Sequence, residues 1–361
     1  MGKHKVGAVF LAGVLAMGTV MTGCSGKDET EGKTVIEMVQ YKPEAVDIFE
    51  QFQDEFNATH DDIYLKIDSP NDAMTILKIF AEYKKDTEYV QYLEETQKAF
   101  GEKVQELCWD NDRFVRGYTE SGERIGEAAA PEANMWLNPQ SWAVISGLAT
   151  PEQGDAALNN VYERLNTEYG AILMDPPYHA HAFDGALAVI YNQGTKENSG
   201  IFSQSQGWLI LAEALRGHGE RAFTYFMENS PAAQNDCAEI RRLEPYCYGQ
   251  FTEGKASKHF GRSHVHWLTG TASTVMVGCV EGILGLRPDL EGLRLSPSVP
   301  KSWKHFEIEK VFRGKQLHIS VENPDEKESG CCSLVLNGQK LADNYIPENL
   351  LQDKNEVILT L

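Results

Sequence analysis

The sequence predicts a mainly α-helical protein: a helical toroid, preceded by a short α/β segment and followed by a small β-domain. Residues 81–300 carry this prediction because their helical segments are joined by irregular loops rich in Trp, Tyr and His. Residues 301–361 have a strand pattern, and residues 25–80 have the order strand, helix, strand. Helices that bury their apolar faces against one another leave their connecting loops free to line a pocket.

The first 24 residues have the order of an export signal. Lys3 and Lys5 precede an apolar run at residues 6–20, which is short for a membrane span, and small residues lead to Cys24. A basic start, an apolar middle and a small-residue end are typical of secretory signals. The segment resembles a bacterial lipoprotein signal, in which Cys24 would be lipidated and would be the only membrane attachment. A buried N-terminal helix is the alternative.

Residues 25–80 predict a short α/β segment. Strands are expected at residues 34–39 and 63–67, with an amphipathic helix at residues 44–57 between them. Together with Asn71-Asp72-Ala73-Met74, this order resembles the opening of the solute-binding lipoproteins of sugar uptake transporters. The resemblance ends near Lys78. It implies a second candidate function, a non-enzymatic carbohydrate-binding lipoprotein.

The remaining elements follow from apolar periodicity. Helices are expected at residues 89–107, 141–148, 207–215 and 269–284, the last ending at Gly285. Strands are expected at residues 306–312, 316–321, 333–336 and 356–361. Asn337-Gly338 is a strong signal for a two-residue hairpin turn, because both residues tolerate a left-handed backbone.

Charge and metal-ligand content narrow the function classes. The formal net charge of −20 argues against a nucleic-acid partner, because phosphate backbones select basic surfaces. The seven cysteines form no CxxC pair, so neither a disulfide framework nor a zinc site is expected. His264 and His266 lack further ligands at matching spacing and are expected to pack or form hydrogen bonds, whereas His218 and His259 are expected at the surface. No metal or cofactor is predicted.

Three polar clusters lie beside aromatic residues. They are Lys196-Glu197-Asn198, residues 244–250 ending at Gln250, and residues 264–271 including Trp267 and Thr269. Sugar sites combine stacking rings with many hydrogen-bonding groups, so these clusters predict a carbohydrate pocket. Thr269-Gly270-Thr271 also opens an apolar helix, where free backbone N–H groups and hydroxyls can hold an anion such as phosphate.

Each cluster has a simpler interpretation as well. A Thr-Gly-Thr sequence before a helix is most often a helix cap, and a Lys-Glu pair is most often a solvated surface pair. Trp142, Trp208 and Trp303 are expected in the core rather than in a pocket.

Seven motifs follow one another from about residue 81 to the C-terminus: residues 137–147 (LNPQSWAVISG), Pro176-Pro177-Tyr178, residues 194–198 (GTKEN), Gly200-Ile201-Phe202, Glu244-Pro245-Tyr246 with Gln250, residues 267–272 (WLTGTA) and residues 283–288 (ILGLRP). In these motifs the chain resembles the C-terminal part of the cellobiose, cellodextrin and chitobiose phosphorylases, grouped as glycoside hydrolase family 94. Many matches in order are far more specific than any one of them.

The resemblance implies a partial (α/α)6 toroid followed by a small β-domain. It implies an inverting reaction in which inorganic phosphate, a co-substrate rather than a cofactor, attacks the anomeric carbon of a β-linked disaccharide and releases sugar 1-phosphate. It also implies site roles: Lys196 and Gln250 would hold the sugar, Tyr191 and Glu197 would border the pocket, and Gln204, Thr269 and Gly270 would bind phosphate. A hydrolase of related fold is the alternative, although water as the nucleophile needs no anion site.

The sequence departs from the family pattern in two places. The family usually has a phosphate-binding His where this chain has Gln204, which donates a hydrogen bond but carries no charge. The catalytic Asp of the family lies in a segment upstream of the helix expected at residues 89–107, where this chain resembles a transporter protein instead. No residue is therefore assigned as the acid, and the chain is expected to be a catalytically incomplete fusion. The family also implies homodimers and a cytoplasmic location, which conflicts with the export signal.

Overall fold

The computed structural model describes residues 33–39, 53, 56–59, 63–68, 78, 80–82, 84–119, 121–179 and 191–361. Cys24, most of the helix expected at residues 44–57, and the segment at residues 71–74 lie outside these ranges. The chain divides into two compact units, residues 1–103 and 104–361, and each is taken by itself.

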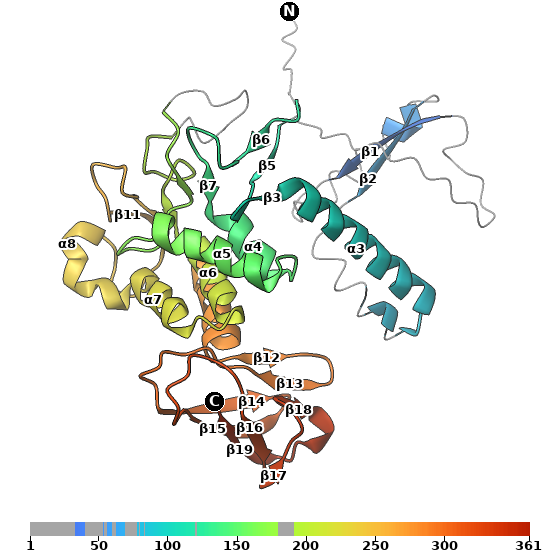
Figure 1. Cartoon of the computed structure of the whole chain (residues 1–361), viewed down its shortest axis with the longest axis vertical. Helices are drawn as coiled ribbons and strands as arrows, with labels where there is room; N and C mark the ends of the chain where they lie inside the picture. The colour runs from blue at the N-terminus through green and yellow to red at the C-terminus, as the bar shows by residue number, and fades with distance from the viewer. Residues whose placement is uncertain are drawn as a thin grey trace, which may run out of the picture. The chain divides into compact units, whose positions relative to one another are not determined.

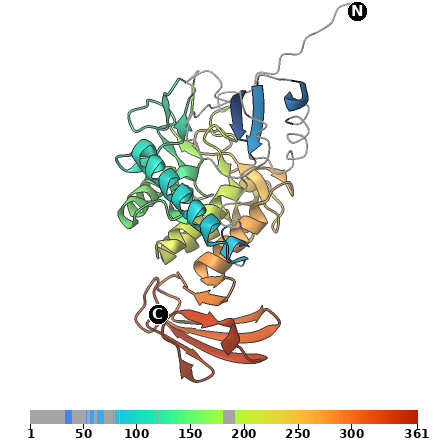
Figure 2. The ribbon, with the colours of Figure 1, turned by 90° about the vertical axis from the view of Figure 1, so that its right-hand side faces the viewer.

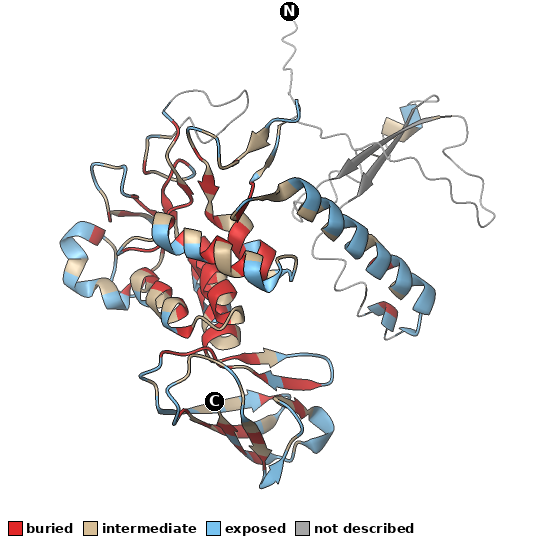
Figure 3. Ribbon diagram, in the orientation of Figure 1, coloured by how far each residue is buried: buried red, intermediate tan, exposed pale blue. Residues whose placement is uncertain are grey.

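The first unit contains two of the expected strands. Strand β1 (Thr34–Val39) pairs in parallel with β2 (Ile63–Asp68), with Thr34 opposite Ile63. The long helix α3 (Thr87–Cys108) confirms the helix expected at residues 89–107. Leu93 is the only buried side chain of α3, and Figure 3 shows most of this helix as exposed.

No helix in the described ranges has both the length and the apolar content needed to cross a bilayer.

The helices of the second unit pack around α6 (Ser203–Leu215), which contacts α4, α7 and α9 (Figure 1). The other helices are α4 (Leu137–Ile145), α5 (Pro151–Asn160) continuing into η2 (Val161–Leu165), α7 (Gly219–Asn229), η4 (Ala232–Cys237), α8 (Ala238–Arg241) and α9 (Thr271–Val277) continuing into η5 (Gly278–Ile283). The three helices expected here are present, although α4 and α6 each begin four residues before the expected start. The sequence analysis missed α5, whose capping box joins Thr150 and Gln153, and α7.

Short strands lie between these helices. Three pairs are β3 (Trp109–Asp110) with β4 (Arg113–Phe114), β5 (Gly117–Tyr118) with β6 (Arg124–Ile125), and β7 (Met135–Trp136) with β8 (Met174–Asp175). A three-stranded sheet has the order β11 (Ser263–His266), β10 (Gly249–Thr252), β9 (Ile201–Phe202). The second unit is therefore richer in strands than the expected all-helical body, and a closed toroid stays a prediction.

The C-terminal strands lie at one end of these helices (Figures 1 and 2). The larger sheet has the order β14 (His305–Phe312), β15 (Lys315–Glu322), β19 (Lys354–Thr360), β16 (Ser333–Leu336), β17 (Gln339–Lys340). The smaller has the order β12 (Leu286–Pro288), β13 (Gly292–Leu295), β18 (Tyr345–Pro347), with η6 (Glu348–Leu350) after it. All four expected strands are confirmed. So is the hairpin turn, because Asn337 and Gly338 have φ of 49° and 82° between β16 and β17.

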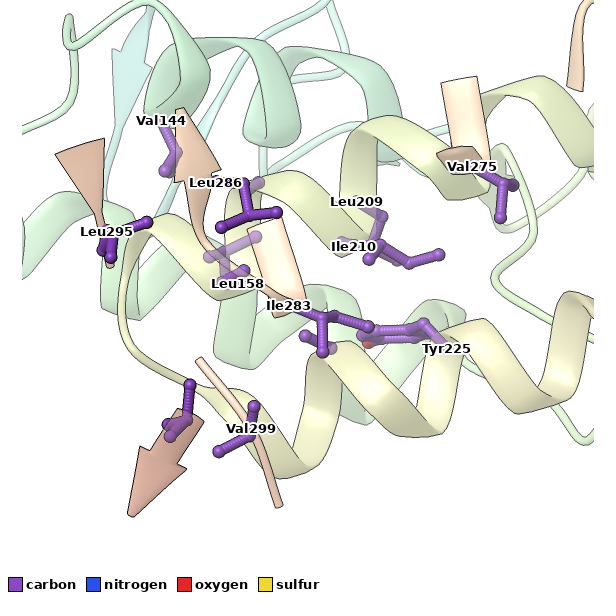
Figure 4. Packing of buried hydrophobic residues seen from close by; sticks show 14 of the residues in the cluster. Val144, Leu158, Leu209, Ile210, Tyr225, Val275, Ile283, Leu286, Leu295 and Val299 are labelled. Atoms are coloured by element: carbon purple, nitrogen blue, oxygen red, sulfur yellow. The ribbon is translucent and has the colours of Figure 1, made fainter. Parts of the chain in front are cut away.

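One continuous apolar core joins the helices to the C-terminal strands. Leu158, Leu209 and Tyr225 from the helices and Leu286 and Leu295 from the strands belong to the same buried cluster (Figure 4). Full burial of one such side chain contributes about 1.5–3 kcal/mol. Trp142 corrects an expectation, because it is 44% exposed.

Buried amide side chains hold distant loops against these helices. The Gln140 amide bonds both the N–H and the C=O of Phe114, at 2.8 and 2.9 Å. The Gln206 amide does the same for Ala171, at 2.8 and 2.9 Å. Each clamp satisfies two backbone groups that would otherwise be buried without partners.

His218 corrects a second expectation, because it belongs to a buried ionic cluster rather than to a free surface. Its Nδ1 lies 2.6 Å from the Glu213 carboxylate, which is fully buried and also 3.0 Å from the Arg221 guanidinium. Burial raises the pKa of Glu213, against the hydrogen bond from His218 and the charge of Arg221, which lower it.

Candidate functional site

The candidate site lies at one edge of the sheet formed by β11, β10 and β9. Because β9 and β11 both run antiparallel to β10, they are parallel to each other and end at the same edge. Helix α6 begins directly after β9, and four residues separate the end of β11 from the start of α9. The sheet thus brings the starts of two helices together at the edge where β10 begins.

Gln204 and Gly270 meet at these helix starts. A Cβ atom at Gly270 would lie 3.6 Å from the side-chain amide of Gln204, and the Thr274 hydroxyl donates to the Gln204 carbonyl at 3.0 Å. The approach depends on Gly207, because a Cβ there would lie 2.3 Å from the Thr274 backbone. Two residues predicted to bind phosphate are therefore neighbours, although 66 positions separate them.

Thr269 lies beside them and is half-buried. Its hydroxyl accepts from the Thr271 N–H at 3.2 Å and is 2.5 Å from the Thr271 hydroxyl. This is a local turn bond, because the N-cap residue of α9 is Gly270 and no side chain caps the helix. The next N–H groups of α9 precede any intrahelical acceptor and lie at the exposed start of the helix. The start of α9 therefore offers donors to an anion.

Lys196 lies over two aromatic rings. Its Nζ is 5.4 Å from the centre of the Tyr191 ring and 5.9 Å from that of Phe251, a residue of β10. Within the described ranges Lys196 has no carboxylate partner, so its charge is available to a ligand. Glu197 is exposed and belongs to the same turn, which agrees with its expected place at the border of a pocket.

The turn that carries Lys196 is tightly held. Lys196 and Ser199 have φ of 45° and 70°, and a Cβ at Gly200 would lie 2.6 Å from the Lys196 backbone. Asn198 is 1% exposed, and its amide bonds the Tyr178 N–H at 2.8 Å, the Tyr178 carbonyl at 3.1 Å and the Tyr191 carbonyl at 2.9 Å. The loop around Lys196 is fixed before any ligand arrives.

Gln250 lies at the same sheet edge but on a different face from Lys196. It is the second residue of β10, next to Phe251, and neighbouring side chains on a strand point to opposite faces. Gln250 therefore shares its face with Thr252, which accepts from the buried Arg241 at 3.0 Å. The structure brings Gln250 to the helix starts and shows no contact between its side chain and Lys196.

The sequence analysis missed an acid–histidine pair beneath this site. The Glu253 carboxylate is 5% exposed, lies 2.6 Å from His264 Nε2 and accepts from the Ser257 hydroxyl. Burial raises the pKa of Glu253, but the hydrogen bonds from Ser257 and His264 outweigh it and hold that pKa below its ordinary value. The His264 ring stacks on Phe251 at 4.8 Å, so Glu253 positions the aromatic floor under Lys196. The expectation that His264 forms hydrogen bonds is confirmed.

Exposed aromatic rings flank the Thr269 segment. Tyr246 and Trp267 are 72% and 66% exposed, with ring centres 5.8 Å apart. The Trp267 indole N–H donates to the Glu244 carboxylate at 2.5 Å. Trp267 and Val265 have φ of 68° and 55°, which bulky residues rarely adopt. A ring pair held in this way matches the stacking surface that the sequence predicted for a sugar.

Comparison with known proteins identifies the family. The family model of the glycosyl hydrolase 94 superfamily, catalytic domain, matches residues 72–285. This chain belongs to the glycosyl hydrolase 94 superfamily. The matched range contains every residue of the candidate site described above, and it confirms the resemblance found in the sequence.

The curated relatives in this superfamily include phosphorylases. The chain is 36% identical to N,N'-diacetylchitobiose phosphorylase of Vibrio proteolyticus over 72% of its own length and 33% of that protein. It is 35% identical to the enzyme of the same name from Vibrio furnissii, over 67% and 31%. It is 27% identical to solabiose phosphorylase of Paenibacillus borealis, over 68% and 32%. The chain thus spans about a third of the length of these relatives.

Proposed function

We propose that this chain carries the phosphate-binding and part of the glycosyl-binding site of a β-glycoside phosphorylase. In the proposed reaction, inorganic phosphate attacks the anomeric carbon of a β-linked disaccharide with inversion, the glycosidic bond breaks, and sugar 1-phosphate and a monosaccharide leave. The observation that carries the proposal is the meeting of Gln204 with the Thr269-Gly270 segment at one sheet edge. Membership in a superfamily whose relatives include disaccharide phosphorylases supports it.

Two helix starts supply the proposed phosphate contacts. The amide of Gln204 donates a hydrogen bond, Thr269 supplies a hydroxyl, and the first N–H groups beyond Gly270 favour an anion through the helix dipole. Where the family usually has a His, which can carry a positive charge, this chain has Gln204, which is a neutral donor. Phosphate binding here therefore depends mainly on backbone groups.

Lys196 and the aromatic residues are proposed to hold the sugar. The Lys196 ammonium donates to hydroxyl groups, while Tyr191 borders the pocket and the pair Tyr246 and Trp267 offers ring faces for a pyranose. Gln250 and Glu197 are assigned to the sugar site by family resemblance alone. No contact with Lys196 supports their assignment.

The acid is left unassigned in this proposal. An inverting phosphorylase needs one carboxyl group that protonates the leaving oxygen, and its pKa is usually raised for that role. Glu253 is engaged by His264 and Ser257, and its pKa is lowered. Glu244 is bound to Trp267. Neither is suited to donate a proton, so no acid is assigned among these two residues. The proposed location is the cytoplasm, where sugar phosphate is retained.

Phosphate and sugar binding test the proposal separately from turnover. The purified chain is titrated with inorganic phosphate by calorimetry and then assayed for sugar 1-phosphate with chitobiose, cellobiose and laminaribiose. Thr269→Ala is expected to weaken phosphate binding at this site by about tenfold, since one charge-assisted contact is lost. Thr224→Ala on α7, whose hydroxyl donates only to the Glu220 carbonyl, is the matched control.

The same assays separate the alternatives. Phosphate affinity and stoichiometry that are both unchanged in Thr269→Ala and in Gln204→Ala would contradict the proposed site. Release of free sugar without any requirement for phosphate would favour a hydrolase. Disaccharide binding that is equal with and without phosphate and unchanged in Lys196→Ala would favour a binding protein.

A further inference from the structure

A polar cavity lies where the end of α6 meets the C-terminal strands, away from the site described above. It has a volume of about 290 Å³, and its lining includes Arg216, Arg287, Ser296, Ser329 and Cys331. Gln204 lies near the start of α6 and Ala214, another lining residue, near its end, so about 15 Å of helix separates the two places. Among the described residues no lining residue is acidic, in a chain whose formal net charge is −20.

Arg287 is the principal group in this cavity. It is half-buried on β12, and its Nε donates to the Glu281 carbonyl at 2.8 Å, which fixes the plane of the guanidinium. Its two Nη groups have no hydrogen-bond partner in the part of the chain that the structure describes. Burial lowers the pKa of Arg287, against the charge of Glu281, yet a guanidinium stays charged at neutral pH. The half-buried guanidinium therefore presents two Nη groups to the cavity, and an anion there would gain a charge-assisted contact.

The other walls supply donors rather than acceptors. The Ser296 hydroxyl accepts from the Asn344 amide at 2.8 Å, so its own proton is free to point into the cavity. Arg216 is bound to Asp155 through Nε and Nη2, at 2.8 and 3.2 Å, and keeps one Nη group. Two carbonyls near the end of α6 are already used, because those of Glu213 and Ala214 accept from the N–H groups of His218 and Gly217. The cavity therefore presents positive charge and hydroxyl protons.

The geometry points to a second oxyanion site in this cavity, one that holds inorganic phosphate or the phosphate group of a sugar monoester through Arg287, Ser296 and Ser329. A planar guanidinium can bond two oxygens of one phosphate, and hydroxyls on other walls suit the remaining oxygens of a tetrahedral ion. The volume also accommodates more than a bare ion. Phosphate bound there would tie the last turn of α6 to the C-terminal strands.

Phosphate titration of the full chain tests this site independently of the proposed function. In a Thr269→Ala background one phosphate is still expected to bind, and Arg287→Gln is expected to weaken it by about tenfold or more, because a charge-assisted pair is lost. Arg242→Gln, at an exposed arginine, is the control for the change in charge. Parallel titrations with inorganic phosphate, sulfate and α-D-glucose 1-phosphate show whether the site prefers the free ion or the monoester.

Alkylation of cysteine gives a second test that needs no variant. Cys331 is half-buried and lines the cavity, whereas its neighbour Cys332 is exposed and lies near Lys327 outside it. Phosphate is expected to slow the reaction of Cys331 with iodoacetamide several-fold and to leave Cys332 unchanged, as read by peptide mass spectrometry. Three outcomes would overturn the inference. The first is no phosphate binding in the Thr269→Ala background, and the second is phosphate affinity in Arg287→Gln equal to that without this change. The third is equal protection of Cys331 and Cys332 by phosphate.

Discussion

The helices of residues 137–283 and the sheet of residues 305–361 differ in how many of their buried polar atoms have hydrogen-bond partners. In the sheet they have partners: the Asn355 amide bonds the backbone of Gln316 and Gln352, and the Asn323 amide bonds the backbone of Trp303 and Lys327. Among the described residues, the buried side-chain polar atoms without a partner lie in the helical region, from Asn138 to Arg241, with Ser298 as the one exception, and none lies in the sheet. Because unpaired polar atoms cost stability, the helical region carries a cost that the sheet does not.

We expect the largest loss of stability in the helical region when α6 is separated from α9. Gly207→Ala places a Cβ 2.3 Å from the Thr274 backbone, which cannot move like a flexible side chain. We expect a loss of at least about 3 kcal/mol in the free energy of unfolding, together with loss of phosphate binding at the Thr269-Gly270 segment as Gln204 moves away from Gly270. Urea unfolding and phosphate titration measure both effects.

Gly117→Ala is the matched control, because a Cβ at Gly117 has no atom within 4 Å. Its unfolding curve is expected to match that of the unchanged chain. Equal stabilities of the two variants would show that α6 and α9 do not pack as closely as described.

Asn198→Ala is expected to have the next largest effect. The change removes three hydrogen bonds to the backbone of Tyr178 and Tyr191, although the Tyr178 carbonyl keeps its bond from Gln193 at 3.2 Å. A loss of about 2–3 kcal/mol follows, with weaker sugar binding because the Lys196 turn is released. Asn192→Ala, at an exposed asparagine before the same turn, is the control. Sugar affinity that falls equally in both variants would contradict the role given to the clamp.

The difference between the regions also explains what the sequence could predict. The strands at residues 305–361 were found because alternation and the Asn337-Gly338 turn are local signals. The site residues were found through motifs, but their contacts were not. The meeting of Gln204 and Gly270 depends on how closely two helices pass at Gly207, and the pairing of Glu253 with His264 depends on strand register. Neither is encoded within a single sequence window.

The pH dependence of stability tests one of the unpaired polar atoms of the helical region, the Glu228 carboxylate. Burial raises its pKa to about 7, against the hydrogen bond from Asn166, which lowers it, and its Oε2 has no partner in the described chain. A carboxyl group with a raised pKa contributes stability that is fully present below its ordinary value of 4.5 and is lost as the pH rises through about 7. The Glu228→Gln variant has no carboxyl group at this position, so it does not lose this stability as the pH rises.

We expect Glu228→Gln to be more stable than the unchanged chain by about 1–2 kcal/mol at pH 8, after allowance for partial solvent exposure. The difference should shrink at pH 5. Urea unfolding at both pH values measures it, and Glu239→Gln, at an exposed residue of α8, is the control. A stability difference that does not change with pH would show that Glu228 is solvated.

The smallest effect is expected in the sheet. Gly338 has φ of 82° in the β16–β17 turn, and a Cβ there has no atom within 4 Å, so Gly338→Ala costs only the backbone strain, about 1 kcal/mol. Phosphate binding should stay unchanged, because the turn lies outside both the sheet edge and the cavity lined by Arg287. Urea unfolding combined with phosphate titration checks both statements. A change in phosphate affinity would mean that the sheet transmits strain to the helices through their shared core, and the two regions would then act as one cooperative unit.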